Sequence, residues 1–96
     1  MIVKLRSVLQ IAKALGGKEH LVAIEDEATV QGLIRALAAK HGEPLKEQLL
    51  LRLDPMELVP HVKIYVNGRG LDFLDGLATG LREGDDVMIM PRVSGG

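Results

Sequence analysis

The chain has 96 residues, enough for one compact domain with one modest core and too few for a second catalytic domain. Its formal net charge is −1 and only two residues are aromatic, so neither a general nucleic-acid-binding surface nor a base-stacking platform is expected. The sequence contains no cysteine, which excludes disulfide bonds, thiolate metal sites and a cysteine nucleophile. Any sulfur chemistry in which this protein takes part must therefore use sulfur from another molecule.

The N-terminal residues show no targeting or membrane-spanning pattern. Charged side chains appear early, at Lys4 and Arg6, and no long apolar run follows them. We therefore expect a cytoplasmic protein that does not associate with a membrane.

The first half of the chain predicts two strands followed by a helix. Residues 2–7 alternate between apolar and charged side chains, and residues 20–25 form a second strand-like segment. Between them, residues 8–15 fit either a loop or a short helix. Apolar side chains then recur with helical spacing over residues 30–41, where Thr29 can act as the N-cap.

The middle of the chain is less regular. Gly42 and Pro44 are expected to end the first helix. A second helical segment is predicted over residues 45–53, with Asp54-Pro55 ending it. From there a loop is expected to run to Pro60.

The last third of the chain predicts two more strands. Residues 62–66 alternate strongly, and Asn67-Gly68 is a turn signal because both residue types accept a positive φ. Short, glycine-punctuated pieces follow over residues 70–85, and the final strand covers residues 87–90 before Pro91 ends it. This order of elements indicates an α+β fold, with one main helix packed across a mixed sheet of four or five strands.

Four segments near the C-terminus carry a resemblance to a known family. They are Val66-Asn67-Gly68-Arg69, residues 73–79, residues 81–87 and the final Pro91-Arg92-Val93-Ser94-Gly95-Gly96. In their order and spacing the chain is similar to the small sulfur-carrier proteins. These include the small subunit of molybdopterin synthase, the thiamine-pathway sulfur carrier and the archaeal ubiquitin-like modifiers. Over residues 1–42 the match is limited to the order and rough length of the elements.

The resemblance implies a ubiquitin-like β-grasp domain over residues 1–92 and a flexible Gly-Gly tail over residues 93–96. It also implies that a ubiquitin-activating-type enzyme adenylates the Gly96 carboxylate with ATP, after which a sulfur donor converts it to a thiocarboxylate. The chain itself would need no bound cofactor, no metal and no catalytic activity of its own, because the activating enzyme supplies them. Gly95 and Gly96 lack a Cβ, so the tail can enter a narrow channel.

The resemblance leaves the sulfur acceptor open. The leading hypothesis is molybdopterin or tungsten-pterin synthesis, with the large subunit of molybdopterin synthase as the acceptor enzyme. The alternatives are a protein modifier joined through Gly96 to lysines, and a sulfur carrier for thiamine, tRNA thiolation or cysteine synthesis. A β-grasp interaction module with an inert tail is a further alternative. Arg6-Ser7-Val8 and Arg92 depart from the pattern of the molybdopterin-type carriers, which affects the pathway more than the fold.

Strand alternation also predicts a partner-binding surface. Seven side chains are expected to face the helix: Val3, Leu5, Val62, Ile64, Val66, Val87 and Ile89. The opposite set is Lys4, Arg6, Lys63, Tyr65, Met88, Met90 and Arg92. In a β-grasp sheet these outward residues form one patch with Tyr65, Met88 and Met90 at its centre and basic residues at its rim. Val93 and Ser94 would extend the contact with a partner. The alternative is that these exposed apolar residues are ordinary surface.

No metal site is predicted. The three histidines, His20, His41 and His61, are far apart and lack ligand spacing. Asp85-Asp86 is better explained as turn chemistry before a strand, and residues 25–27 as a solvated loop.

Overall fold

The computed structural model describes residues 1–92. Its elements, in chain order, are β1 (Ile2–Ser7), α1 (Leu9–Leu15), β2 (Glu19–Ala23), α2 (Val30–His41), α3 (Glu43–Leu49), β3 (Leu50–Leu53), β4 (Met56–Leu58), β5 (Lys63–Val66), β6 (Arg69–Gly70), the short 3₁₀ helices η1 (Leu71–Phe73) and η2 (Gly76–Ala78), and β7 (Asp86–Met90). The longest helix described, α2, has 12 residues, and no helix in this part of the chain is long and apolar enough to cross a membrane.

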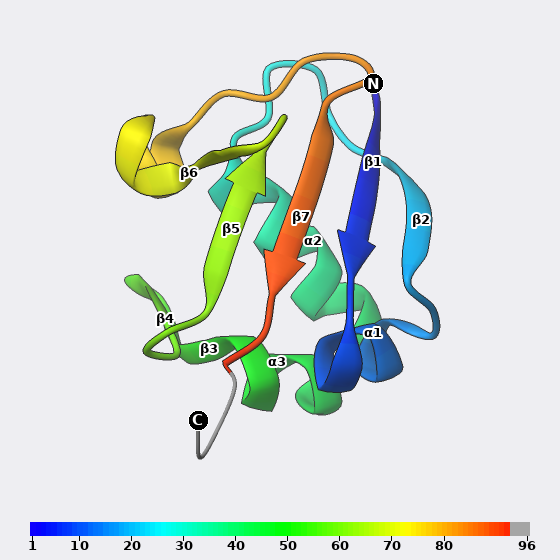
Figure 1. The fold of residues 1–96 in the computed structure, drawn as a ribbon, viewed down its shortest axis with the longest axis vertical. Coiled ribbons are helices and arrows are strands. Elements are labelled where there is room, and N and C mark those ends of the chain that lie inside the picture. Colours follow the sequence, from blue (N-terminus) through cyan, green and yellow to red (C-terminus); the bar gives the residue numbers. More distant parts are fainter. Residues whose placement is uncertain (93–96) are drawn as a thin grey trace.

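Five strands form one mixed sheet in the order β2-β1-β7-β5-β6. The central pair, β1 and β7, is parallel, whereas β1 with β2, β5 with β7 and β5 with β6 are antiparallel. Figure 1 shows α2 crossing one face of this sheet, with α1 and α3 at the end where β7 finishes. The predicted α+β architecture, a mixed sheet with one main helix across it, is therefore confirmed.

The core lies between the sheet and α2. All seven side chains predicted to face the helix are at most 7% exposed: Val3, Leu5, Val62, Ile64, Val66, Val87 and Ile89. They meet the buried stripe of α2, which consists of Val30, Leu33, Ile34, Leu37 and Ala38. Because full burial of a large aliphatic side chain contributes about 1.5–3 kcal/mol, this layer fixes which face of each strand points inward.

The ends of α2 follow from local chemistry. Thr29 is extended, and its side-chain oxygen accepts a hydrogen bond from the Gly32 amide at 3.2 Å, so the predicted N-cap is confirmed. Gly42 closes the helix with a φ of 71°, a conformation that favours glycine. The ambiguous stretch before β2 is a helix, α1, which ends at Gly16 with a φ of 86°.

The prediction of a second helix over residues 45–53 is wrong in its last turn. The helix α3 ends at Leu49, and residues 50–53 form β3, which pairs antiparallel with β4. Consequently, the expected loop to Pro60 contains a strand. The leucine-rich sequence over residues 49–53 has no apolar periodicity that distinguishes a helix from a strand. The pairing is decided instead by contacts across the hairpin, such as the Val59 amide to the Leu49 carbonyl at 2.9 Å.

The predicted turn at Asn67-Gly68 joins β5 to β6. Both residues have positive φ, 52° for Asn67 and 83° for Gly68, as two-residue hairpins require. The Asn67 side chain donates to Asp85 Oδ1 and accepts from the Asp86 amide, each at 2.9 Å. This turn therefore ties the β5–β6 hairpin to the start of β7.

The turn yields a stability prediction with a matched control. Gly68→Ala should lower the free energy of unfolding by about 1–2 kcal/mol, because an L-residue is strained in the left-handed region. Apart from its two chain neighbours, no residue of the described chain lies within 4 Å of the added methyl group, so contacts with the rest of the domain add no further cost. Gly80 is equally open but has no positive φ, and Gly80→Ala should leave stability unchanged or slightly raised. Urea unfolding measures both variants, and equal effects would contradict the backbone explanation.

Candidate functional site

The outward face of the sheet brings the predicted partner-binding residues together. Tyr65 of β5 lies opposite Met88 of β7, and Met88 is also the register partner of Arg6 on β1. Two residues further along β7, Met90 lies opposite Lys63 of β5. Tyr65, Met88 and Met90 are half-buried, so they form a continuous apolar centre on the side of the sheet away from α2.

This apolar centre extends toward β6 and η1. A Cβ placed on Gly70 would lie 3.6 Å from the Tyr65 ring and 3.9 Å from the ring of Phe73. The Tyr65 ring therefore packs beside a strand that has no side chain of its own at this position. Phe73 is 85% exposed, which is unusual for a large aromatic side chain. The sequence analysis did not select Phe73, although a lone phenylalanine among glycines and aspartates is a usable signal.

The rim of the outward face has fewer unpaired basic side chains than the sequence predicts. Lys4, Lys63 and Arg92 are exposed, as expected. Arg6 lies on the face, but its Nε donates to Asp86 Oδ1 at 2.9 Å. This hydrogen bond, together with the charge of Asp86, raises the pKa of Arg6. Arg6 is thus part of an ion pair on the face and is not a free cation available to a partner.

The end of β7 is anchored up to the last described residues. The Ser7 hydroxyl is buried and donates to the Ile89 carbonyl at 2.7 Å. Pro91 is buried, and the Gln10 side-chain amide donates to the Arg92 carbonyl at 3.0 Å. Gln10 was not predicted from the sequence, because nothing in its local pattern indicates a contact 82 residues away. The domain therefore fixes where the chain leaves the sheet, beside Met90.

The remaining predicted site residues lie beyond this point. Val93, Ser94, Gly95 and Gly96 are outside the residues that the structure describes, so their predicted roles and the predicted flexible tail stay predictions. Within residues 1–92 there is no group of three or more histidine, aspartate or glutamate side chains that could hold a metal ion.

The Gln10 contact gives a local prediction. Gln10→Ala should reduce the backbone order at Arg92 without a measurable change in global stability, because the lost hydrogen bond is exposed. The matched control is Gln31→Ala on α2, whose side chain makes no hydrogen bond to Arg92 and whose replacement should leave Arg92 unchanged. Backbone ¹⁵N relaxation at Arg92 distinguishes the two variants. An unchanged order parameter in Gln10→Ala would show that the buried Pro91 alone fixes the exit.

Comparison with known proteins shows which family the chain belongs to. The ThiS family model matches residues 8–96. Small archaeal modifier protein 3 of Haloferax volcanii is 35% identical over 96 residues, which is 100% of both chains. The sulfur carrier protein CysO of Mycobacterium tuberculosis (strain H37Rv) is 37% identical over 81 residues, 84% of each chain.

Solved structures agree with this assignment. SAMP1 from Haloferax volcanii superposes with a TM-score of 0.82 at 25% identity, covering 100% of both chains. A putative molybdopterin converting factor subunit 1 from Pyrococcus furiosus gives 0.74 at 26% identity, covering 97% of this chain and 99% of that one. The BexX/CysO complex of Amycolatopsis orientalis contains a chain with a TM-score of 0.69 at 26% identity, covering 98% and 99%.

The fold and the outward face thus define a ubiquitin-like β-grasp protein of the sulfur-carrier and small-modifier class. Within that class, the chain belongs to the ThiS family.

Proposed function

We propose that this protein is a sulfur carrier whose working group is the Gly96 carboxylate. The observation that carries the proposal is the family match, which continues through the final Gly-Gly to residue 96. The anchored end of β7 supports it, because a domain fixed up to Arg92 presents the following residues at a defined place.

The chemistry requires an activating partner. A carboxylate is a poor acyl donor because its leaving group would be oxide. When the Gly96 carboxylate attacks the α-phosphorus of ATP, pyrophosphate leaves and an acyl adenylate forms. A sulfur nucleophile then attacks the acyl carbon, AMP departs, and a thiocarboxylate results. The chain has no cysteine, so the sulfur comes from a separate donor.

The partners of the proposal are an adenylating enzyme, a sulfur donor and an acceptor enzyme. We propose that they dock on the outward face, because a partner that holds residues beyond Arg92 passes next to Met90 and Met88. As acceptor we propose an enzyme of molybdopterin or tungsten-pterin synthesis, of the kind formed by the large subunit of molybdopterin synthase. The similar Pyrococcus furiosus protein, a putative molybdopterin converting factor subunit 1, supports this choice.

A protein modifier is the second candidate. The full-length relative named small archaeal modifier protein 3 favours it. Both candidates share the adenylation step and differ in the nucleophile that follows, which is sulfur in one case and a lysine amine in the other. Thiamine, tRNA and cysteine synthesis are further acceptors for the carrier, and the CysO relative is itself named a sulfur carrier.

One experiment separates these candidates. The chain is isolated from its native cells, and its intact mass and its covalent partners are measured together. A sulfur carrier gives a free chain whose mass reflects the exchange of one oxygen for one sulfur. A modifier gives isopeptide-linked conjugates between Gly96 and target lysines. If cells lacking the adenylating enzyme still contain the thiocarboxylate, the proposed activation is wrong.

A further inference from the structure

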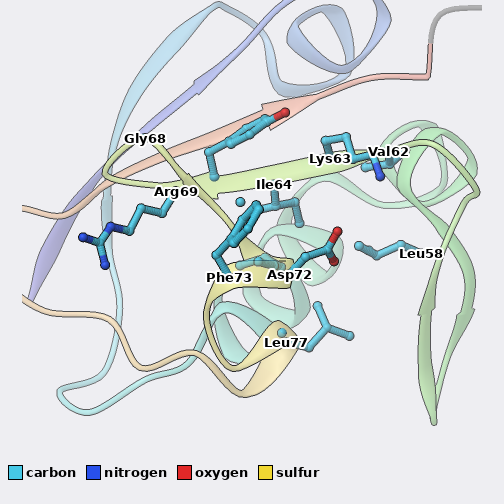
Figure 2. Close-up of a pocket in the computed structure, with 13 residues that line it drawn as sticks. Leu58, Val62, Lys63, Ile64, Gly68, Arg69, Asp72, Phe73 and Leu77 are labelled. Atoms are coloured by element: carbon cyan, nitrogen blue, oxygen red, sulfur yellow. The ribbon is translucent and has the colours of Figure 1, made fainter.

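A groove of about 830 Å³ lies on the side of β5 opposite β7. Its walls come from β5, from η1 and η2, and from Leu58 at the end of β4 (Figure 2). The groove shares Lys63 and Tyr65 with the outward face. From these residues it extends to the side of the sheet edge, away from Met88 and Met90.

The strand edge along this groove is open. β7 pairs with β5 over its full length, from Lys63 to Val66. On the other side, β6 pairs only with Tyr65 and Val66. Among the strands that the structure describes, none pairs with this side of Ile64; the backbone of Lys63 faces β7, and η1 lies beside the edge. An uncovered strand edge is a template on which an extended peptide can add a further strand.

The groove is apolar at its centre. Ile64 is 3% exposed and forms the floor, and the half-buried Leu77 contributes to one wall. Figure 2 shows the Phe73 ring beside Ile64 at the mouth of the groove. Phe73 packs little against its own domain, since 85% of its surface is exposed. An apolar side chain of a partner could cover Phe73 and the half-buried Leu77, and this would remove water from the most exposed aromatic surface of the domain.

The charges around the groove favour an acidic occupant. Lys63 and Arg69 stand at opposite ends of the β5 edge, and both are exposed. Within residues 1–92 neither forms an ion pair with a carboxylate. Asp72 is the acidic residue of the lining, so two cations face one carboxylate. The excess positive charge selects for a negatively charged partner and against a basic one.

We propose that this groove binds an extended acidic segment of a partner protein, which adds a strand beside Lys63 and Ile64. Because side chains alternate along a strand, the residues of the segment that face inward are apolar and contact Phe73 and Leu77. Those that face outward are acidic and lie near Lys63 and Arg69. This site takes no part in the Gly96 chemistry, although it shares Lys63 and Tyr65 with the outward face.

The test uses a defined probe and the full chain. The probe is a fluorescein-labelled, acetylated heptapeptide that alternates valine with glutamate, and its binding is followed by anisotropy. The same peptide with lysine in place of glutamate should bind at least about tenfold more weakly, or about 1.4 kcal/mol. In ¹⁵N-labelled protein, the largest amide shifts should appear at Lys63, Ile64 and Phe73.

Variants locate the contact. Phe73→Ala should weaken binding of the acidic probe about tenfold and leave the fold intact, because the ring is exposed. Leu21→Ala is the matched control. Leu21 is a 76% exposed apolar residue on β2, at the opposite edge of the sheet, and its replacement should change nothing. Lys63→Glu should reverse the preference between the acidic and the basic peptide.

A backbone-modified probe tests strand addition itself. Methylation of alternate peptide nitrogens removes the donors on one edge of the probe. Of the two possible methylation patterns, one should abolish binding and the other should preserve it. Equal binding of both methylated probes would overturn strand addition. Amide shifts centred on Met88 and Met90, or absence of binding at millimolar probe, would overturn the site.

Discussion

Deletion of Gly96 should abolish thiocarboxylate formation by the cognate adenylating enzyme, ATP and a sulfur donor. The proposed acyl centre is the carboxylate of that residue, and its removal moves the new carboxylate back by one residue along the chain. An activating enzyme that positions the carboxylate against the α-phosphorus of ATP gains its rate from that alignment. A displacement of about 3.3 Å, the rise of one extended residue, exceeds what such alignment tolerates. Intact-mass spectrometry of the reaction mixture measures the product directly.

Two further variants make this test specific. Gly96→Ala keeps the carboxylate in register and adds one methyl group, so it should slow the reaction without abolishing it, because a Cβ narrows the fit in a tight channel. Gly80→Ala lies in open space within the domain and should react like the parent. Modification of the Gly96 deletion at the parental rate would show that the reacting group lies elsewhere.

The second large effect is expected on the outward face. The double variant Met88→Asp with Met90→Asp should weaken binding of the adenylating enzyme about tenfold or more, which corresponds to about 1.4 kcal/mol. Methionine adapts well to partner surfaces. Two buried carboxylates in its place would have to lose their hydration on docking. The partner would contact both positions because they precede the exit at Arg92 directly.

The structure explains why this variant should still fold. Met88 and Met90 are half-buried on the side away from α2, and each new carboxylate would lie next to a cation, Arg6 for one and Lys63 for the other. Leu21→Asp is the control, since Leu21 lies on the same face but at the β2 edge, opposite Lys4. Calorimetry gives the affinities and circular dichroism confirms the fold. A folded double variant with parental affinity would exclude the outward face as the docking surface.

The sequence alone predicted the elements that have one clear local pattern, either the alternation of a strand or the apolar spacing of a helix. Residues 2–7 and 62–66 alternate in sequence, and α2 has a full apolar stripe with Thr29 as its cap. For these elements the inward face follows from the period. Val87 and Ile89 lie in an unbroken apolar run, and their inward assignment was also correct. The central position of β7 came from the family resemblance and not from the residues themselves.

What escaped prediction depends on contacts between distant parts of the chain. The β3–β4 hairpin was missed because leucine suits a helix and a strand alike. The Arg6–Asp86 pair and the Gln10–Arg92 hydrogen bond each join residues 80 or more positions apart. The exposed Phe73 was missed for a different reason. Its setting among glycines and aspartates is a usable signal, but a phenylalanine is normally expected to be buried, whereas Phe73 in η1 is 85% exposed.

The position of β7 has a consequence for how the protein is made. A chain interrupted before Asp86 has two separate strand pairs, β1 with β2 and β5 with β6, and no strand between them. Non-local pairing of this kind forms late, since the loop that it closes spans most of the chain. During synthesis the sheet can therefore assemble only after β7 has left the ribosome. Fragments that lack β7 cannot form the five-stranded sheet, and they should be cleaved faster by proteases than the full chain. Only chains that carry β7 can therefore form the complete sheet. An activating enzyme that recognises this sheet would bind those chains and not shorter fragments.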